Sequence, residues 1–248
     1  MTGGHAVPRL KLLGDFEVRF GDEVLGLSGP AQRLLAVLAV RHRDRPVRRG
    51  ALAEHLWPDA PPARAASNLR SVLWRLPRRA GKPLVTGSAT VVRLWNGIRV
   101  DLWEAEQQVR ELCGHPAPAI SSLADVHRLT QDLLPDWDDE WIAVEQESFR
   151  QQRLHALERC ASGLREAGRY ADALAAALAA VRAEPLRESA HRRVIEVHLD
   201  EGNHAEALRQ YDSYRRLIAE ALGIAPSPEI RRLVAPLLGR PIDSARTG

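Results

Sequence analysis

Two cysteines, Cys113 and Cys160, are all that the 248-residue sequence contains, so it lacks the dense cysteine framework of a small secreted domain. Both lie in segments with helical patterning, and we expect reduced, buried thiols. No apolar run approaches the ~20 residues of a membrane-spanning helix, and residues 1–9 lack the apolar core of a secretory signal. These absences predict a cytoplasmic protein with no membrane partner.

Catalytic and metal-binding patterns are missing too. The sequence has no Gly-x-Ser-x-Gly motif, no cysteine–histidine nucleophile arrangement and no isolated carboxylate pair. Five histidines lack a cysteine or carboxylate partner at the spacing of metal ligands: His127, His155, His191, His198 and His204. We therefore predict a protein that is not an enzyme and that has no metal and no cofactor.

Lysine is nearly absent, since Lys11 and Lys82 are the only two, and arginine supplies almost all of the positive charge. The arginine excess reflects genomic base composition, but its distribution is informative. Residues 1–99 hold 17 basic against 7 acidic residues, whereas residues 100–248 hold 18 against 25. This asymmetry predicts a first part that faces nucleic acid and a second part that faces another partner.

The segment from Ala63 to Arg79 separates into two faces when it is drawn as a helix at about 100° per residue. One face is apolar and consists of Ala65, Ala66, Leu69, Val72, Leu73 and Leu76. The other has no acidic residue and consists of Arg64, Ser67, Ser71, Trp74, Arg75 and Arg78. Surface helices usually mix charges, because opposite charges four residues apart are stabilising. This face therefore suits a phosphate-lined groove; an ordinary solvated arginine face is the alternative.

Short elements of two kinds surround this segment. Residues 10–13, 16–20 and 24–27 have strand character, with Gly-Asp turns between them. Helices are expected at 28–43, where Pro30 suits a first turn, and at 48–57, before a proline-rich loop at 58–62. Residues 84–86 and 91–95 indicate a hairpin. The order of strands, three helices and hairpin predicts a winged helix-turn-helix with a short N-terminal sheet.

From residue 100 onward the patterning is helical, with helices expected at 101–113, 121–134, 138–167 and 228–238. The stretch Gly168–Leu174 is echoed 34 residues later by Gly202–Leu208. A repeat of this length, with glycine at the turn and alanine at close helix contacts, is typical of the tetratricopeptide fold. The predicted fold class is therefore mainly α with a small β part: a winged helix-turn-helix followed by an all-α, tetratricopeptide-like domain.

Trp137 and Trp141 are four residues apart, which is about one helical turn. Such a pair occurs either as an aromatic ligand-binding site or as packing between helices. We expect packing between helices.

Several motifs follow one another in a characteristic order. In the first part they are Leu12-Leu13-Gly14, Gly29-Pro30, Leu56-Trp57-Pro58-Asp59, Asn68-Leu69-Arg70-Ser71 and Leu73-Trp74-Arg75-Leu76. In the second part they are Val100-Asp101, Trp137 with Trp141, Pro185-Leu186-Arg187-Glu188 and Leu222-Gly223-Ile224. With these motifs in order, the chain from Leu10 to Leu238 resembles the Streptomyces antibiotic regulatory proteins, in their small two-domain form. That family joins an OmpR-type winged helix to a bacterial transcriptional activation domain.

The resemblance implies a flexible tail at residues 1–9, a DNA-binding domain at 10–99, an all-helical activation domain at 100–240 and a tail at 241–248. It also implies a sequence-specific activator that binds direct repeats, about one helical turn (~10–10.5 bp) apart, in promoters of an antibiotic or other secondary-metabolite gene cluster. The expected partners are double-stranded promoter DNA, RNA polymerase holoenzyme and a second copy, as a homodimer or a tandem pair on DNA. In OmpR-type activators the loop before the basic helix can face polymerase, which implies a polymerase contact at Pro58, Asp59 and Ala60.

In the winged-helix interpretation the third helix enters the major groove, where each base pair has a distinct pattern of donors and acceptors. The candidates for base or groove contact are Arg64, Ser67, Ser71, Trp74, Arg75 and Arg78. The candidates for phosphate contact, near helix starts and on the wing, are Arg33, Arg48, Arg49, Arg70 and Arg93. Trp74 has two interpretations, contact with a sugar or thymine methyl group and packing at the domain edge, of which we favour packing. Trp57 is expected to close the core behind the second helix.

Pro77 departs from the family, which keeps one continuous basic helix here. Proline lacks a backbone donor and disfavours helical geometry at Leu76, so we predict a kink or an early end that redirects Arg78 and Arg79. The segment 90–94 lacks the Gly-Tyr pair usual before the last strand of the wing, which makes a groove contact of the wing a weaker expectation than that of the helix.

Two alternative functions stay open. The first is a helical-repeat adaptor that binds a protein or peptide, against which the basic first part and the acid-free helix face argue. The second is a ligand-gated form of the activator, because helical repeats form concave surfaces that hold small molecules. The sequence identifies no ligand.

Overall fold

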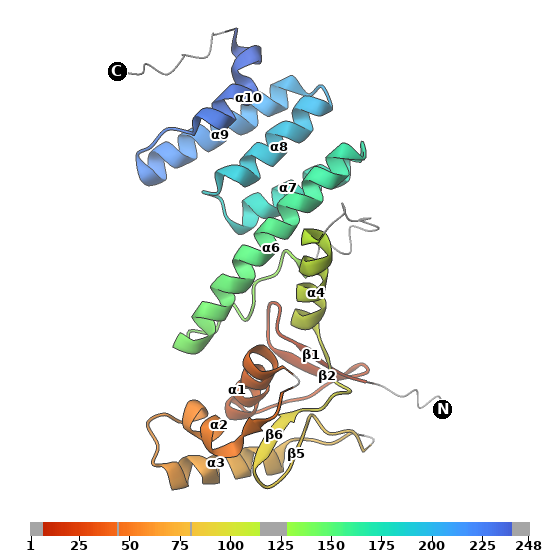
Figure 1. Cartoon of the computed structure of the whole chain (residues 1–248), viewed down its shortest axis with the longest axis vertical. Coiled ribbons are helices and arrows are strands. Elements are labelled where there is room, and N and C mark those ends of the chain that lie inside the picture. The colour runs from red at the N-terminus through yellow and green to blue at the C-terminus, as the bar shows by residue number, and fades with distance from the viewer. Residues whose placement is uncertain (1–6, 44, 80, 115–127, 240–248) are drawn as a thin grey trace. The chain divides into compact units, whose positions relative to one another are not determined.

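The computed structural model describes residues 7–43, 45–79, 81–114 and 128–239. The chain divides into two compact units: the first comprises residues 1–105 and 132–146, and the second comprises residues 106–131 and 147–248. Within the described residues, all named strands precede residue 101 and helices make up most of the rest (Figure 1). The predicted fold class is confirmed, while the predicted domain division at residue 100 stays a prediction.

A four-stranded sheet in the order β3-β2-β1-β7 opens the first unit. β1 (Pro8–Lys11) pairs antiparallel with β2 (Glu17–Phe20), which pairs antiparallel with β3 (Glu23–Val24), so the predicted meander is confirmed. Successive side chains of a strand point to opposite faces of the sheet, and Leu10, Val18 and Phe20 lie on the face that is buried in the core. Pro8 and Arg9 belong to β1, which shortens the predicted tail; residues 1–6 lie outside the described residues. No sequence pattern predicted β7 (Arg99–Val100), which pairs parallel with β1.

Three helices follow the sheet. α1 (Gly29–Val37) has Pro30 in its first turn, as predicted, and continues into the π-helical turn η1 (Leu38–His42). α2 (Arg49–Leu56) and α3 (Pro62–Arg75) are joined by the proline-rich loop. The apolar faces of these helices meet in one core, which includes Leu34, Leu35, Leu38, Leu52, Leu56 and Leu69.

The predicted hairpin is confirmed as β5 (Val85–Gly87) paired antiparallel with β6 (Val91–Leu94). A third strand, β4 (Val47–Arg48), pairs with β6 and gives the sheet order β4-β6-β5. Because β4 runs directly into α2, the hairpin and the start of α2 are held together. This is the wing arrangement that the element order predicted.

Asp101 is a half-buried carboxylate that connects the end of β1 to the start of α4 (Asp101–Cys113). Its Oδ1 accepts hydrogen bonds from the backbone N–H groups of Leu12 at 2.8 Å and Leu102 at 2.7 Å, and its Oδ2 accepts one from Leu13 at 3.1 Å. Burial raises the pKa of Asp101, and the three N–H donors act in the opposite direction. The carboxylate satisfies backbone donors that the sheet and the helix leave unpaired.

We expect Asp101→Ala to destabilise the first unit by about 1–3 kcal/mol, the cost of leaving buried backbone donors unsatisfied. All six tryptophans belong to this unit, so the midpoint of urea unfolding followed by tryptophan fluorescence measures the effect. Asp22→Ala, a change in an exposed turn, is the matched control. Equal midpoints for the two variants would contradict this role of Asp101.

The segment 132–146 packs within the first unit. The predicted helix 121–134 extends too far: residues 121–127 lie outside the described residues, Arg128 is helical, and residues 129–134 form turns and a bridge. Leu133 forms an isolated bridge with Leu13, and the Leu134 N–H donates to the Leu12 carbonyl at 2.9 Å. Pairing with the chain beyond β1 therefore replaces the helical hydrogen bonds that the local pattern favours.

The two tryptophans of this segment correct another expectation. Trp137 precedes the helix α6 (Glu140–Glu166) and stacks on Phe16, with ring centroids 5.9 Å apart. Trp141 lies in the first turn of α6, meets the His55 ring edge-on at 5.8 Å and has the Arg41 guanidinium over its ring at 5.5 Å. Both are half-buried against the first unit. The expectation of packing between helices is confirmed for Trp141, which joins α6 to α2. It is wrong for Trp137, which is not helical.

The second unit contains the rest of α4 and α6, followed by α7 (Tyr170–Ala183), α8 (Glu188–Asp200), α9 (His204–Leu222) and α10 (Pro228–Leu238). The predicted 34-residue repeat is confirmed in its geometry. Gly168 and Gly202 occupy equivalent turns with φ of 71° and 79°, a conformation that favours glycine. Ala173 and Ala207 are fully buried at the helix contacts that follow. The predicted C-terminal tail lies outside the described residues.

The two cysteines differ in exposure. Cys160 is buried, as expected, whereas Cys113 is free and exposed, so the expectation of a buried thiol is wrong there. Cys113 is the last residue of α4, and its side chain falls outside the buried stripe that Leu112 and Val109 form.

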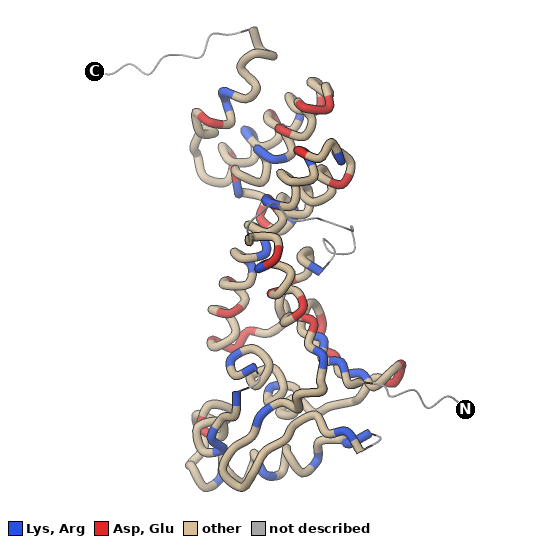
Figure 2. Tube along the Cα trace, turned by 45° about the vertical axis from the view of Figure 1, so that its right-hand side comes forward, with Lys and Arg blue, Asp and Glu red and all other residues tan. Residues whose placement is uncertain are grey.

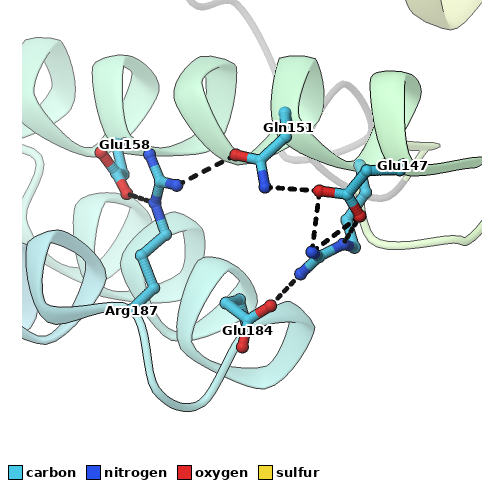
Figure 3. A network of polar contacts seen from close by, with 6 residues as sticks. Glu147, Gln151, Glu158, Glu184 and Arg187 are labelled. Atoms are coloured by element: carbon cyan, nitrogen blue, oxygen red, sulfur yellow. Dashed lines mark hydrogen bonds and ion pairs between the residues drawn. The ribbon is translucent and has the colours of Figure 1, made fainter. Parts of the chain in front are cut away.

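Polar contacts fix the segment between α7 and α8 onto α6 (Figure 3). The Arg187 Nε donates to Glu158 at 2.5 Å, and another of its guanidinium nitrogens donates to the Gln151 side chain at 3.3 Å. Gln151 in turn donates to Glu147, and Arg150 pairs with both Glu147 and Glu184. Sequence motifs around Arg187 thus have a structural role, because they join neighbouring helices of the repeat.

His191 is buried in α8 as a neutral ring. Its Nε2 lies 2.8 Å from the Pro185 carbonyl, and its Nδ1 lies 2.7 Å from the Gln210 amide nitrogen. A tautomer with the proton on Nε2 satisfies both contacts. Burial lowers the pKa of His191, although the Pro185 carbonyl and Glu188 act to raise it.

The stability of the protein should therefore fall on acidification below about pH 6.5, the ordinary histidine pKa in an unfolded chain. Below that pH the His191 ring is protonated in the unfolded chain but stays neutral in the folded protein, which favours unfolding. Above that pH the ring is neutral in both states, and its contribution to the free energy of unfolding is complete. Urea unfolding at several pH values, followed by circular dichroism, measures the trend. His42 and His55 have lowered pKa values too, so the comparison with His191→Gln isolates this ring. An identical pH dependence in wild type and variant would contradict the assignment.

Candidate nucleic-acid interface

The exposed face of α3 carries the candidate residues for base contact. The helix buries Ala65 and Leu69 and half-buries Ala66, Val72 and Leu73. On the opposite face every candidate is exposed: Arg64, Ser67, Ser71, Trp74 and Arg75. No acidic residue occurs in α3, and its charges in Figure 2 are basic alone. The two-face separation that the sequence predicted is present in the structure.

α3 ends at Arg75, and Leu76 is extended, with φ −62° and ψ 129°. The predicted early end is confirmed, and its physical reason is that Pro77 disfavours the helical conformation of the residue before it. Beyond it, the Arg79 guanidinium donates to Glu23 at 3.0 Å and its backbone bridges to Lys82. Arg78 is exposed but no longer belongs to the helix.

Trp74 is 86% exposed. The favoured interpretation, packing at the domain edge, is therefore wrong. α3 stops one residue later, and Leu76 turns into the core, so no following helical turn covers the indole. An exposed indole beside arginines on one helix is available for contact with a partner.

The candidates for phosphate contact fall into two groups. Arg48 and Arg70 are exposed and Arg49 and Arg93 half-buried, and none of the four has a side-chain hydrogen bond or ion pair within the described residues. Arg33, in contrast, forms an ion pair with Asp139. Because Asp139 is 106 residues away in the sequence, no local pattern could have predicted this pair.

The wing fixes two of these arginines in place. Arg48 lies opposite Val91 in the pairing of β4 with β6, and the Arg49 N–H donates to the Thr90 carbonyl at 2.9 Å. The turn of the hairpin is held by Ser88, whose hydroxyl lies 3.1 Å from that of Thr90. The start of α2 and the wing therefore form one rigid edge beside α3.

The loop between α2 and α3, the candidate polymerase contact, has Pro58 and Asp59 exposed and Ala60 half-buried. It borders a hollow of about 760 Å³ whose lining includes Trp57, Trp141 and His55. Trp57 is half-buried and covers the end of α2. Burial lowers the pKa of His55, and the charges of Arg41 and His42 act in the same direction. Sequence analysis predicted the loop but did not predict that residues 139–141 line the hollow beside it.

In the described ranges, no three histidine, cysteine or acidic side chains are grouped as a metal site. His155, His198 and His204 lie in helices of the second unit, and His127 lies outside the described residues. No helix in those ranges combines the length and apolar content that crossing a membrane requires.

A three-helix core with an exposed basic helix and a hairpin wing, followed by stacked helical pairs, defines a class of transcription regulators. Comparison with known proteins agrees. A model of the family described as "Bacterial transcriptional activator domain" matches residues 100–238. The chain belongs to this family of bacterial transcriptional activators, and its resemblance to the Streptomyces antibiotic regulatory proteins is confirmed.

Individual relatives show the same relationship. The regulatory protein AfsR of Streptomyces griseus is 28% identical over 247 residues, and that of Streptomyces coelicolor is 28% identical over 237 residues. These matches cover 96% and 91% of this chain but only 25% and 24% of AfsR, so the chain spans about a quarter of those relatives. The transcriptional regulatory protein MoaR1 of Mycobacterium tuberculosis is 22% identical, with 93% of this chain and 79% of MoaR1 covered.

Among solved structures, Mycobacterium tuberculosis EmbR in complex with a low-affinity phosphopeptide has the same fold. The TM-score is 0.67 at 21% identity, and the match covers 96% of this chain and 67% of EmbR. At this identity the likeness concerns the fold alone.

Proposed function

We propose that the chain is a sequence-specific DNA-binding activator and that α3 reads base edges in the major groove. The observation that carries the proposal is the exposed, acid-free face of α3 on a winged-helix core. Arginine donates two parallel hydrogen bonds to guanine, and serine is small enough to allow close approach. Arg64, Ser67, Ser71 and Arg75 are the residues that we assign to this contact.

Phosphate contacts orient the helix in this proposal. Arg48 ends β4, Arg49 begins α2, and Arg70 and Arg93 lie on α3 and the hairpin. These positions are on the edges that flank a helix seated in the groove. Arg33 contributes only when it exchanges Asp139 for a phosphate, so we expect it to be the weakest of the five.

Recruitment of RNA polymerase holoenzyme is assigned to the loop at Pro58, Asp59 and Ala60, of which the first two residues are exposed. The targets would be direct repeats in promoters of a secondary-metabolite gene cluster, bound by a homodimer or by a tandem pair. The support for these assignments is the family resemblance, together with the fact that the two AfsR relatives are regulatory proteins of Streptomyces.

Arg75→Ala should reduce affinity for the promoter upstream of a neighbouring biosynthetic operon about 5- to 150-fold, because a bidentate arginine–guanine contact is worth ~1–3 kcal/mol. Binding to a scrambled duplex should change far less. Fluorescence anisotropy on both duplexes measures the effect. Arg232→Ala, which removes an exposed arginine from α10, is the control with the same change in charge.

The outcomes separate the parts of the proposal. Wild-type affinity of the Arg75 variant for both duplexes would remove Arg75 from the readout. Weak and equal binding of both duplexes by the wild type would instead reject sequence-specific DNA binding and leave the adaptor function as the better explanation.

A further inference from the structure

A second hollow, of about 550 Å³, lies between the end of α3, the start of α2 and the hairpin. Its lining includes Arg49, Arg70 and Arg78 together with the apolar surfaces of Leu73, Trp74 and Pro83. No acidic residue lines it, in contrast to the hollow beside the α2–α3 loop, where Asp139 and Glu140 take part. Three guanidinium groups, from α2, α3 and the segment after α3, therefore surround one space whose lining has no compensating negative charge.

The arginines of this hollow have unused hydrogen-bonding capacity. None of them has a side-chain partner within the described residues. The Nε of Arg49 is buried and lacks a hydrogen-bond acceptor, and such a buried unsatisfied donor is destabilising. The arrangement is thus one that an anion with several acceptor oxygens would stabilise.

Pro77 explains why Arg78 takes part. In a continuous helix Arg78 would follow Trp74 and Arg75 on the outer face, where it would point toward base edges. Because α3 ends at Arg75, Arg78 instead lines the hollow, whereas Arg79 pairs with Glu23. The departure from the family's continuous helix therefore changes the role of one arginine.

We propose that this hollow binds the sugar–phosphate backbone of one DNA strand. Arg49, Arg70 and Arg78 hold the phosphate, and the face of Trp74 lies against the deoxyribose. The inference rests on the proposed DNA binding and deepens it, because it assigns Arg78 and Trp74 to affinity rather than to the reading of sequence. Arginine forks match phosphate oxygens bidentately, and an indole offers a flat apolar surface to a sugar ring.

The first test is the salt dependence of binding by Arg78→Ala, measured by anisotropy on the promoter and on the scrambled duplex. Loss of one phosphate contact should reduce affinity about eightfold at 0.1 M salt on both duplexes, and should lower the slope of log K against log salt by about 0.9. A loss confined to the promoter duplex, or an unchanged slope, would overturn the assignment of Arg78 to phosphate. Arg232→Ala is again the control for charge.

The second test locates the phosphate. Phosphates of the promoter duplex are replaced one at a time by neutral methylphosphonate. One position should weaken the wild type but leave the affinity of Arg78→Ala unchanged, since the contact is already absent there. If every position weakens both proteins equally, the site does not hold a phosphate of DNA.

Trp74 is tested with a pair of variants. Trp74→Phe should keep most of the affinity and Trp74→Ala should lose it equally on both duplexes, because a flat ring suffices for a sugar. A loss of discrimination between the duplexes would show that Trp74 reads a base, and would overturn its part of the proposal.

Free phosphate is the other source of the same chemistry. The wild type is titrated with inorganic phosphate at constant ionic strength and followed by phosphorus NMR, and should show no saturable binding that depends on Arg78. If Arg78→Ala abolishes saturable phosphate binding but keeps the DNA affinity of the wild type, the hollow is a free-anion site and the proposal is rejected. If the wild type binds neither duplex, both the proposed function and this inference are rejected. If the wild type binds the promoter and Arg78→Ala binds it equally well, this inference alone fails.

Discussion

Glu158→Gln should lower the free energy of unfolding by about 3 kcal/mol, which is at the lower end of the ~3–5 kcal/mol lost when one member of a buried ion pair is removed. The Glu158 carboxylate accepts hydrogen bonds from Arg187 at 2.5 Å and from the Ser189 hydroxyl at 2.7 Å. Its side chain is only 10% exposed and that of Arg187 is 20% exposed. Glutamine keeps the shape but removes the charge, so Arg187 remains partly buried without a counterion (Figure 3).

Glu147→Gln is the matched control, since it makes the same chemical change on the same helix and in the same network. The Glu147 side chain is 53% exposed, and ion pairs in solvent contribute little to stability. Urea unfolding followed by circular dichroism should therefore show a clear shift of the midpoint for Glu158→Gln and almost none for Glu147→Gln. Similar midpoints for the two variants would mean that burial does not distinguish the two carboxylates.

Local patterns predicted most of the fold. The apolar stripe of α3, the first-turn position of Pro30 and the effect of Pro77 each depend on residues within a few positions of one another, so sequence reasoning reaches them. The 34-residue repeat was recognisable for a similar reason, because Gly168 and Gly202 mark equivalent turns whose conformation favours glycine.

The contacts that escaped prediction all join residues far apart in the chain. Asp101 binds the backbone of Leu12 and Leu13 across almost 90 residues. The chain after β1 also pairs through its backbone with residues 133–134, which the local pattern had assigned to a helix. Tertiary hydrogen bonds override local preference in such places, and nothing within a short window records them.

The candidate interface shows the same division between local and distant causes. Which side of α3 faces outward follows from its periodicity, and all of its candidates are exposed. The exposure of Trp74 depends on whether another element covers it, and the pairing of Arg33 depends on Asp139. Sequence analysis therefore identified the exposed face of α3, but not the exposure of Trp74 or the ion pair of Arg33.

The number of free arginines leads to a quantitative prediction for DNA binding. Arg48, Arg49, Arg70, Arg78 and Arg93 have no side-chain partner within the described residues, and we assign all five to phosphates. Each neutralised phosphate contributes about 0.9 to the slope of log K against log salt, so one protomer should give a slope of about −4.5. Between 50 and 200 mM salt the affinity should then fall roughly 500-fold.

The same titration distinguishes one bound protomer from two. A tandem pair on direct repeats doubles the number of phosphate contacts, which predicts a slope of about −9 on a duplex with two repeats and about −4.5 on a duplex with one. Because Arg33 is already paired with Asp139, Arg33→Ala should change neither slope, whereas Arg70→Ala should lower both. A slope near zero for the wild type would mean that these arginines are solvated and do not meet phosphate. Equal slopes on the two duplexes would show that one protomer binds at a time.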